Sequence, residues 1–231
     1  MSITGYKVLL EGNNLNRILE SLLVVIKISF LSLLLGLLLG LFIGILRTLR
    51  LRPLQWFFQV YLEIFRIVPL LVLLFVFYYI LPEALDTQID QQLVSILVFV
   101  LWIAAEMSDL VRKAIENVSK SQLEIGRSLG FDRWQLYRVI LLPQGLPTII
   151  PDTLNLVTRV IKSSSLLMMI GVPELIRVGT QVIENYAVTI PTASFWVYGA
   201  LFLLYFGLCF PLSKLAKILE KRAAQGGQYA D

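Results

Sequence analysis

Ionisable side chains within long apolar runs are the first candidates for chemistry in this sequence. They are Glu63, Arg66, Glu106, Asp109, Arg159 and Lys162. A charged group at membrane depth is costly, so it usually has a partner and often marks a path for a polar solute or ion. Counting about 1.5 Å per residue from the ends of the predicted spans puts four of them in the middle or inner half of the bilayer. These four are Glu63, Arg66, Glu106 and Lys162, so opposite charges are available at similar depth.

Two interpretations of these charges stay open. Glu63, Arg66 and Glu106 could form structural ion pairs between spans, or they could line a path. Lys162 is the stronger path candidate because three hydroxyls follow it, and hydroxyls can satisfy opened backbone or donate to a carboxylate. These hydroxyls belong to Ser163, Ser164 and Ser165. Nearby prolines favour an interrupted helix of the kind that transporters use at midplane sites. They are Pro143, Pro147 and Pro151.

The composition is that of an integral membrane protein. Hydrophobic residues make up 57% of the 231 residues and charged residues 16%, and the mean hydropathy is +0.77, whereas soluble domains are usually about 45 to 50% apolar. Histidine is absent, and the one cysteine, Cys209, lies in an apolar run. Disulfide, zinc and haem chemistry are therefore disfavoured, and so is a membrane enzyme with a paired nucleophile and base.

Five stretches are long and apolar enough to cross a bilayer. They cover residues 22–46, 54–81, 93–111, 146–172 and 193–212. Basic residues cluster after the first, third and fifth stretch, while acidic residues such as Glu83 and Asp90 lie on the other side. The positive-inside rule therefore predicts an N-terminus outside the cell and a cytoplasmic C-terminus. We expect an extracytoplasmic segment 1–20, one transmembrane domain 21–222 with a cytoplasmic loop 112–145, and a disordered tail 223–231.

The first span carries three glycines, Gly36, Gly40 and Gly44, four residues apart. This spacing aligns them on one helix face, where a second backbone could approach closely. The pattern favours a helix-packing or subunit interface over glycines scattered by chance, but it names no partner.

The predicted cytoplasmic loop contains a polar, helix-forming stretch, SQLEIGRSLGFDRWQLYRVILLP, residues 121–143. Ser121 with Glu124 fits a capping box, Gly130 suits the left-handed residue that ends a helix, and Asp132 with Gln135 offers a second start. A helix, a sharp turn and a second helix are predicted. The second helix has an apolar face that needs a cover. That face comprises Trp134, Tyr137, Ile140 and Leu141.

The periodicity does not decide what covers this apolar face, and lipid headgroups and a partner protein are equally open alternatives. Helix-turn-helix binding of DNA is remote in a membrane protein. The spacing of Glu124, Gly130, Ile140, Leu142 and Pro143 resembles the EAA loop of ABC importer permeases, with Ile125 and Gly126 in place of the family's two alanines.

The resemblance extends over residues 24–222. In order, YLEIFRIVPLLVLLFVFYYILP, AAEMSDLVRKAI, SQLEIGRSLG, ILLPQGLP and IKSSSLLMMIGVPEL are similar to blocks of the polar amino acid permease subfamily, which serves histidine, glutamine and arginine-type uptake. Ile67 and Val68 replace a usual Gly and Thr, and Ser163 replaces a usual Asp or Asn.

The resemblance implies an all-α, five-helix transmembrane domain of a type I importer in the bacterial inner membrane. The expected partners are two ATP-binding cassette ATPases, a second permease that is identical or homologous, an extracytoplasmic solute-binding protein, membrane lipid and an amino acid, but no nucleic acid. The coupling segment would be Glu124, Ile125, Gly126, Arg127, Ser128, Leu129 and Gly130. Metal and cofactor sites are not expected in this chain, which has no Walker loop, so ATP and magnesium would bind the partner ATPase. A basic and an acidic side chain could complement a zwitterionic amino acid.

A stand-alone secondary transporter or channel is the rival from another class. It predicts inverted internal repeats, which the sequence does not show, and it has no need for the cytoplasmic loop.

Overall fold

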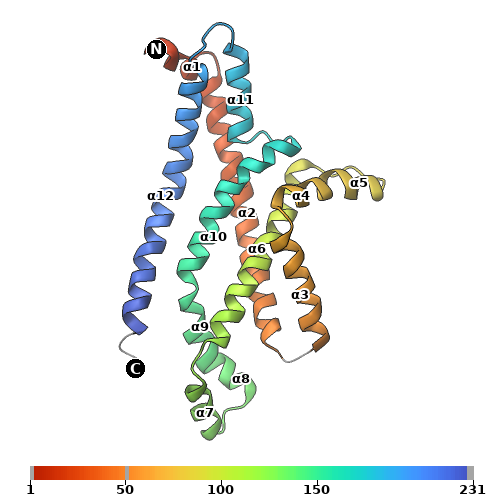
Figure 1. Ribbon diagram of the computed structural model, residues 1–231, viewed down its shortest axis with the longest axis vertical. Coiled ribbons are helices and arrows are strands. Elements are labelled where there is room, and N and C mark those ends of the chain that lie inside the picture. The colour runs from red at the N-terminus through yellow and green to blue at the C-terminus, as the bar shows by residue number, and fades with distance from the viewer. Residues whose placement is uncertain (1–2, 50–51, 228–231) are drawn as a thin grey trace. The chain divides into compact units, whose positions relative to one another are not determined.

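The computed structural model describes residues 3–49 and 52–227, and its regular elements in these ranges are helices. The chain divides into two compact units. The first comprises residues 1–33, 70–99 and 158–211, and the second comprises residues 34–69, 100–157 and 212–231. Figure 1 labels the helices.

The described helices follow one another along the chain as α1 (Lys7–Leu10), α2 (Asn14–Thr48), α3 (Arg52–Ile67), α4 (Leu70–Phe75), α5 (Leu81–Ala84), α6 (Gln91–Glu116), α7 (Lys120–Ser128), α8 (Arg133–Gln135), α9 (Leu142–Thr148), α10 (Ile150–Ser163), α11 (Leu175–Tyr186) and α12 (Ala193–Gly227). Two π-helical turns, Val76–Ile80 and Leu136–Leu141, and the 3-10 helices Ile3–Tyr6 and Ser164–Ile170 complete the set.

Three of these helices are long and apolar enough to cross a membrane, and they are Asn14–Thr48, Gln91–Glu116 and Ala193–Arg222. Two further pairs of helices are each bent at a short break, and they raise the number of spans to five if each pair counts as one span. The pairs are Pro53–Ile67 with Leu70–Ala84 and Ile150–Ile170 with Leu175–Tyr186. The first pair is broken at Val68 and Pro69, since proline lacks the backbone donor that a helix interior needs. The expected number of five spans therefore stays a prediction.

Several helix ends differ from the sequence expectation. The first long helix begins at Asn14, eight residues before the predicted span, so residues 14–20 are helical, and their expected extracytoplasmic location stays a prediction. Helix α12 continues to Gly227, so residues 223–227 are helical where a disordered tail was expected, and residues 228–231 lie outside the described range. The expectation relied on hydropathy, which detects apolar length and does not register polar turns that extend a helix.

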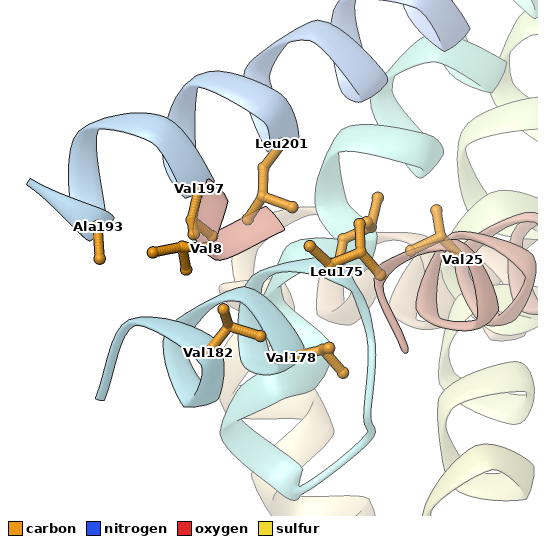
Figure 2. Close-up of a cluster of buried hydrophobic side chains, with 9 residues drawn as sticks. Val8, Val25, Leu175, Val178, Val182, Ala193, Val197 and Leu201 are labelled. Atoms are coloured by element: carbon orange, nitrogen blue, oxygen red, sulfur yellow. The ribbon is translucent and has the colours of Figure 1, made fainter. Parts of the chain in front are cut away.

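A buried apolar cluster forms the core of the first unit (Figure 2). Val8 of α1 and Val25 of α2 pack with side chains of α11 and α12. The contributors from these two helices are Leu175, Val178, Val182, Ala193, Val197 and Leu201. Ile161, at the end of α10, packs against the same cluster. The cluster thus fixes the end of α10. The Lys162 segment, residues 162–170, begins there.

Helices α2 and α6 pack closely in the second unit through the glycines of α2. A methyl group added to Gly36 would lie 2.7 Å from Ile103, one on Gly40 would lie 2.5 Å from Met107, and one on Gly44 would lie 2.6 Å from Val111. Carbon atoms in contact are normally about 3.5 to 4.0 Å apart, so α6 fills the space that a side chain would need. The four-residue spacing on α2 matches the four-residue spacing on α6, and α6 is the packing partner within this chain.

Candidate functional site

Lys162 lies where the chain changes its helical form. Helix α10 ends at Ser163, and a 3-10 helix continues over Ser164–Ile170. The hydroxyl of Ser164 donates to the carbonyl of Ile161 over 2.8 Å, and the hydroxyl of Ser165 donates to that of Lys162 over 2.8 Å. These bonds supply donors to carbonyls at the change of helix type, as expected for hydroxyls beside an interrupted helix. Ser164 is buried, whereas the side chain of Lys162 is exposed within the chain.

The 3-10 segment ends at Gly171, whose φ of 96° is in the left-handed region that favours glycine. A Cβ there would also lie 2.7 Å from the side chain of Gln91. With its amide oriented to pair, Gln91 donates to the carbonyls of Ile170 and Gly171 over 3.2 Å each. The start of α6 thus holds the end of the Lys162 segment in the first unit.

Glu174 is a functional candidate that the sequence reading missed, because it follows the fourth predicted span and so lies outside the apolar runs that were searched for charges. It is fully buried. Its carboxylate caps α11 by accepting from the backbone N–H groups of Ile176 (3.0 Å) and Arg177 (2.8 Å), and it accepts from the hydroxyl of Tyr205 over 3.2 Å. An acidic residue directly before a helical pattern is the available sequence signal. Glu174 joins α11 to α12 beside the Lys162 segment.

A second polar cluster lies in the second unit and centres on Asp109. Its carboxylate is 2.8 Å from the ammonium of Lys113, 3.2 Å from the guanidinium groups of Arg66 and Arg112, and 3.8 Å from that of Arg47. Arg66 is also 3.9 Å from Glu106. The structure therefore brings Arg66 and Glu106 together as expected for ion pairing, but Asp109 is the nearer anion.

Arg47, Arg112 and Lys113 were assigned to loops by the positive-inside count, and the structure places all three in this cluster. Arg47 lies in the last turn of α2, with 5% of its side chain exposed. Arg112 and Lys113 lie three and four residues after Asp109 on α6, a spacing at which helical side chains meet. That spacing was the signal in the sequence.

Glu63 contributes to the same region of α3. It accepts from the amide of Gln59, one turn earlier, over 2.8 Å. Glu63 and Gln59 line an open cavity of about 410 Å³, together with Arg47, Leu62, Arg66, Ile67, Asp109, Arg112 and Lys113. Two of the predicted path residues, Glu63 and Arg66, therefore face one cavity, and Glu106 pairs with the second of them.

The predicted coupling stretch folds as a helical hairpin, with one cap different from the expectation. Helix α7 begins at Lys120, after Ser119, so the predicted capping box of Ser121 and Glu124 is wrong. Gly130 has a φ of 83° and ends the first arm. Asp132 and Gln135 form the predicted second capping box, with both bonds at 2.8 Å. Figure 1 shows α7 and α8 as short helices beyond the end of α9.

Gly126 lies at the inner side of this hairpin. It is buried, and a Cβ there would lie 2.7 Å from the side-chain ends of Leu136 and Ile140. The missing methyl group lets these two larger side chains close the two arms on each other. The hydroxyls of Tyr137 and Thr48 lie 2.6 Å apart and connect the hairpin to the end of α2.

The outer side of the hairpin carries large apolar side chains that the rest of the described chain leaves uncovered. Ile125 is 60% exposed, Leu129 70% and Trp134 70%. Ile125 of α7 and Leu129, directly after the end of α7, are four residues apart and point to the same side. The sequence placed the apolar face on Trp134, Tyr137, Ile140 and Leu141. The structure turns Leu141 inward, half-buries Tyr137 and Ile140, and leaves Trp134 outside. Gly126 provides the room for Ile140.

Residues 36–225 match the family of binding-protein-dependent transport system inner membrane components. A protein of Bacillus subtilis (strain 168), described as the probable amino-acid ABC transporter permease protein YckA, is 34% identical over 201 residues, which cover 85% of this chain and 84% of that protein. The L-cystine transport system permease protein TcyB of the same strain is 31% identical over 181 residues, covering 76% of this chain and 73% of that protein.

The structure is also similar to one chain in a crystal structure of an amino acid ABC transporter with histidines. The TM-score is 0.81 at 25% sequence identity, and the match covers 91% of this chain and 95% of that chain. The similarity thus extends over sequence and fold together.

Proposed function

Because the chain belongs to the family of binding-protein-dependent transport system inner membrane components, we propose that it is the permease subunit of an importer that moves a polar amino acid across the inner membrane. Relatives are amino-acid ABC transporter permeases, and the chain has apolar membrane-spanning helices. ATP hydrolysis in a partner drives alternating access in this proposal.

The observation that carries the proposal is the exposed apolar side of the hairpin α7–α8. Ile125, Leu129 and Trp134 are each at least 60% exposed. An apolar helix face of this kind fits a hydrophobic groove of a partner protein, and the ATPase is the partner that an importer requires. The segment from Glu124 to Gly130 would then transmit the motion, with ATP and magnesium bound by the ATPase and not by this chain.

The substrate path in this proposal includes Lys162, beside the hydroxyls of Ser163, Ser164 and Ser165. Its exposed ammonium at a change of helix type suits the carboxylate of an amino acid. Glu63, Arg66 and Glu106 would supply the remaining charges, because Glu63 and Arg66 line a cavity and Glu106 lies near Arg66.

The complete assembly would contain two ATPase subunits, a second permease and an extracytoplasmic solute-binding protein. In the proposed five-span topology, with an outer N-terminus and a cytoplasmic C-terminus, the hairpin would lie on the ATPase side. The interrupted pairs α3–α4 and α10–α11 would each form one span in this arrangement.

Co-purification and transport test the proposal. Tagged protein from the native membrane should retain an ATPase, and the reconstituted complex should hydrolyse ATP faster when binding protein and one of the common amino acids are present. Transport by the chain without an ATPase, driven by an ion gradient, would instead support the secondary transporter. Replacing Ile125 and Leu129 by Ser should release the ATPase, whereas Val188→Ser, at a side chain that is 94% exposed outside the hairpin, should not.

A further inference from the structure

The cavity beside Asp109 contains more hydrogen-bond donors than the neighbouring protein oxygens satisfy. Arg47 is the clearest case, because 95% of its side chain is buried. Its guanidinium lies 3.4 Å from Ser108, 3.4 Å from Gln59 and 3.8 Å from Asp109. Hydrogen bonds from N–H to oxygen are usually about 2.9 to 3.0 Å long, so these three contacts are long for a buried cation.

Arg112 is under-satisfied at a different atom. Its terminal nitrogens pair with Asp109 and Glu116, but its Nε is buried and has no hydrogen-bond partner in the described part of the chain. Asp109 cannot supply the missing contacts, because its two oxygens already face four cations. A buried donor without an acceptor is costly, so the protein does not fully compensate the charge of this guanidinium.

The wall of the cavity favours an anion in charge and size. Four basic side chains line it, Arg47, Arg66, Arg112 and Lys113, against two carboxylates, Glu63 and Asp109. Glu106 and Glu116 balance the cluster as a whole, but neither lines this cavity. The volume of about 410 Å³ is in the range of small-ligand sites. Guanidinium groups match the tetrahedral oxygens of a phosphate better than a single point charge does.

The cavity lies near the ends of two helices, and helix length indicates that this level is that of the lipid phosphates. Arg47 is one residue from the end of α2, and Arg112 is four residues from the end of α6. The 26 residues of α6 span about 39 Å, longer than a hydrocarbon core of about 30 Å, so its last turns reach the headgroups. An adjoining cavity of about 480 Å³ shares Arg47, Gln59 and Arg112, and the exposed Trp56 also lines it. Tryptophan is typical of this membrane level.

We propose that this cavity binds the phosphate group of an anionic membrane lipid, with Arg47 and Arg112 as its principal ligands. The phosphate compensates the excess positive charge of the cavity wall, and the acyl chains leave past Trp56 into the bilayer. Free phosphate offers the same chemistry without the chains, so the test separates the two sources. Glu63 and Arg66, which belong to the proposed substrate path, also line this cavity, so the variants that test lipid binding leave these two residues unchanged.

Lipid binding to the purified complete transporter in a neutral detergent tests the site. Native mass spectrometry would compare phosphatidylglycerol with phosphatidylcholine of the same acyl chains. We expect wild type to prefer phosphatidylglycerol, and the double substitution Arg47→Gln with Arg112→Gln to weaken that binding about tenfold or more, since hydrogen bonds to charged groups are lost. Lys214→Gln with Lys217→Gln removes the same charge on exposed positions of α12 and should leave binding unchanged.

Lys113→Gln is the second variant, because a side chain that is 56% exposed can be replaced with less risk to folding. It should reduce phosphatidylglycerol binding by a smaller factor. A second experiment compares the melting temperature of the complex in inorganic phosphate with that in chloride at equal ionic strength. If phosphate raises the melting temperature of wild type and wild type binds the two lipids equally, the ligand is the free ion and not the lipid. Equal binding of both lipids and of phosphate by wild type and both variants would overturn the proposal.

Discussion

Arg66 of α3 donates to Asp109 of α6 over 3.2 Å, and the two side chains join these helices through a carboxylate that is 91% buried. Arg47 brings α2 to the same carboxylate at 3.8 Å. Asp109 is thus the common anion of three helices in the second unit. Its neighbours would repel one another without it.

Asp109→Asn should destabilise the protein by about 3 kcal/mol or more, because removing one member of a buried ion pair leaves charges uncompensated. Thermal unfolding of the purified complex, followed by tryptophan fluorescence, measures the effect. Glu116→Gln is the control, since its pair with Arg112 is half exposed, and exposed pairs contribute about 0 to 1 kcal/mol. Equal shifts for the two variants would contradict the central role of Asp109.

Gly40→Ala should cost about 1 to 3 kcal/mol, the usual range for overpacking, because the new methyl group would lie 2.5 Å from Met107 and 2.9 Å from the carbonyl of Ala104. Gly207→Ala is the matched control, since nothing lies within 4 Å of its added Cβ. Helix propensity alone favours alanine at Gly207 by about 1 kcal/mol. The two substitutions should therefore shift the melting temperature in opposite directions, and a gain at Gly40 would disprove the close packing.

Gly130→Ala should uncouple ATP hydrolysis from transport nearly as strongly as Gly130→Leu. No atom lies within 4 Å of a Cβ at this position, whereas the φ of 83° disfavours any side chain by about 1 to 2 kcal/mol. Gly130→Asn should retain more coupling, because asparagine tolerates this conformation better. Substrate-stimulated ATPase activity in vesicles measures the effect, and a loss that grows steadily with side-chain volume would favour a steric role instead.

Lys162→Met should reduce amino acid transport at least about tenfold if its ammonium binds the substrate carboxylate, since a hydrogen bond to a charged group contributes about 1.5 to 3 kcal/mol. Lys162→Arg should retain part of the activity because the charge is kept. Uptake into proteoliposomes is the measurement, with assembly checked by co-purification of the ATPase. Lys217→Met, at an exposed position of α12, is the control. Normal uptake by an assembled Lys162→Met complex would remove Lys162 from the path.

Local patterns were strong predictors where the physics is local. The positive φ of Gly130 and the reciprocal bonds of Asp132 and Gln135 follow from residue types a few positions apart. The predicted capping box at Ser121 was wrong because Ser119 and Ser121 both precede a helical pattern. The helix begins after Ser119, whose side chain makes no capping hydrogen bond. Apolar length likewise predicted the long helices but not their polar ends at Asn14 and Gly227.

By itself the sequence determined a helical membrane protein with a hairpin around Gly130 and glycines on one face of α2, since composition, spacing and turn chemistry act within a few residues. Only the tertiary structure decided which groups meet. It placed α6 against those glycines, made Asp109 the anion that joins α2, α3 and α6, and buried Glu174 at the start of α11 beside Tyr205. The reason is physical: a buried charge is paired by residues far apart in the chain, and their side-chain directions are set by packing.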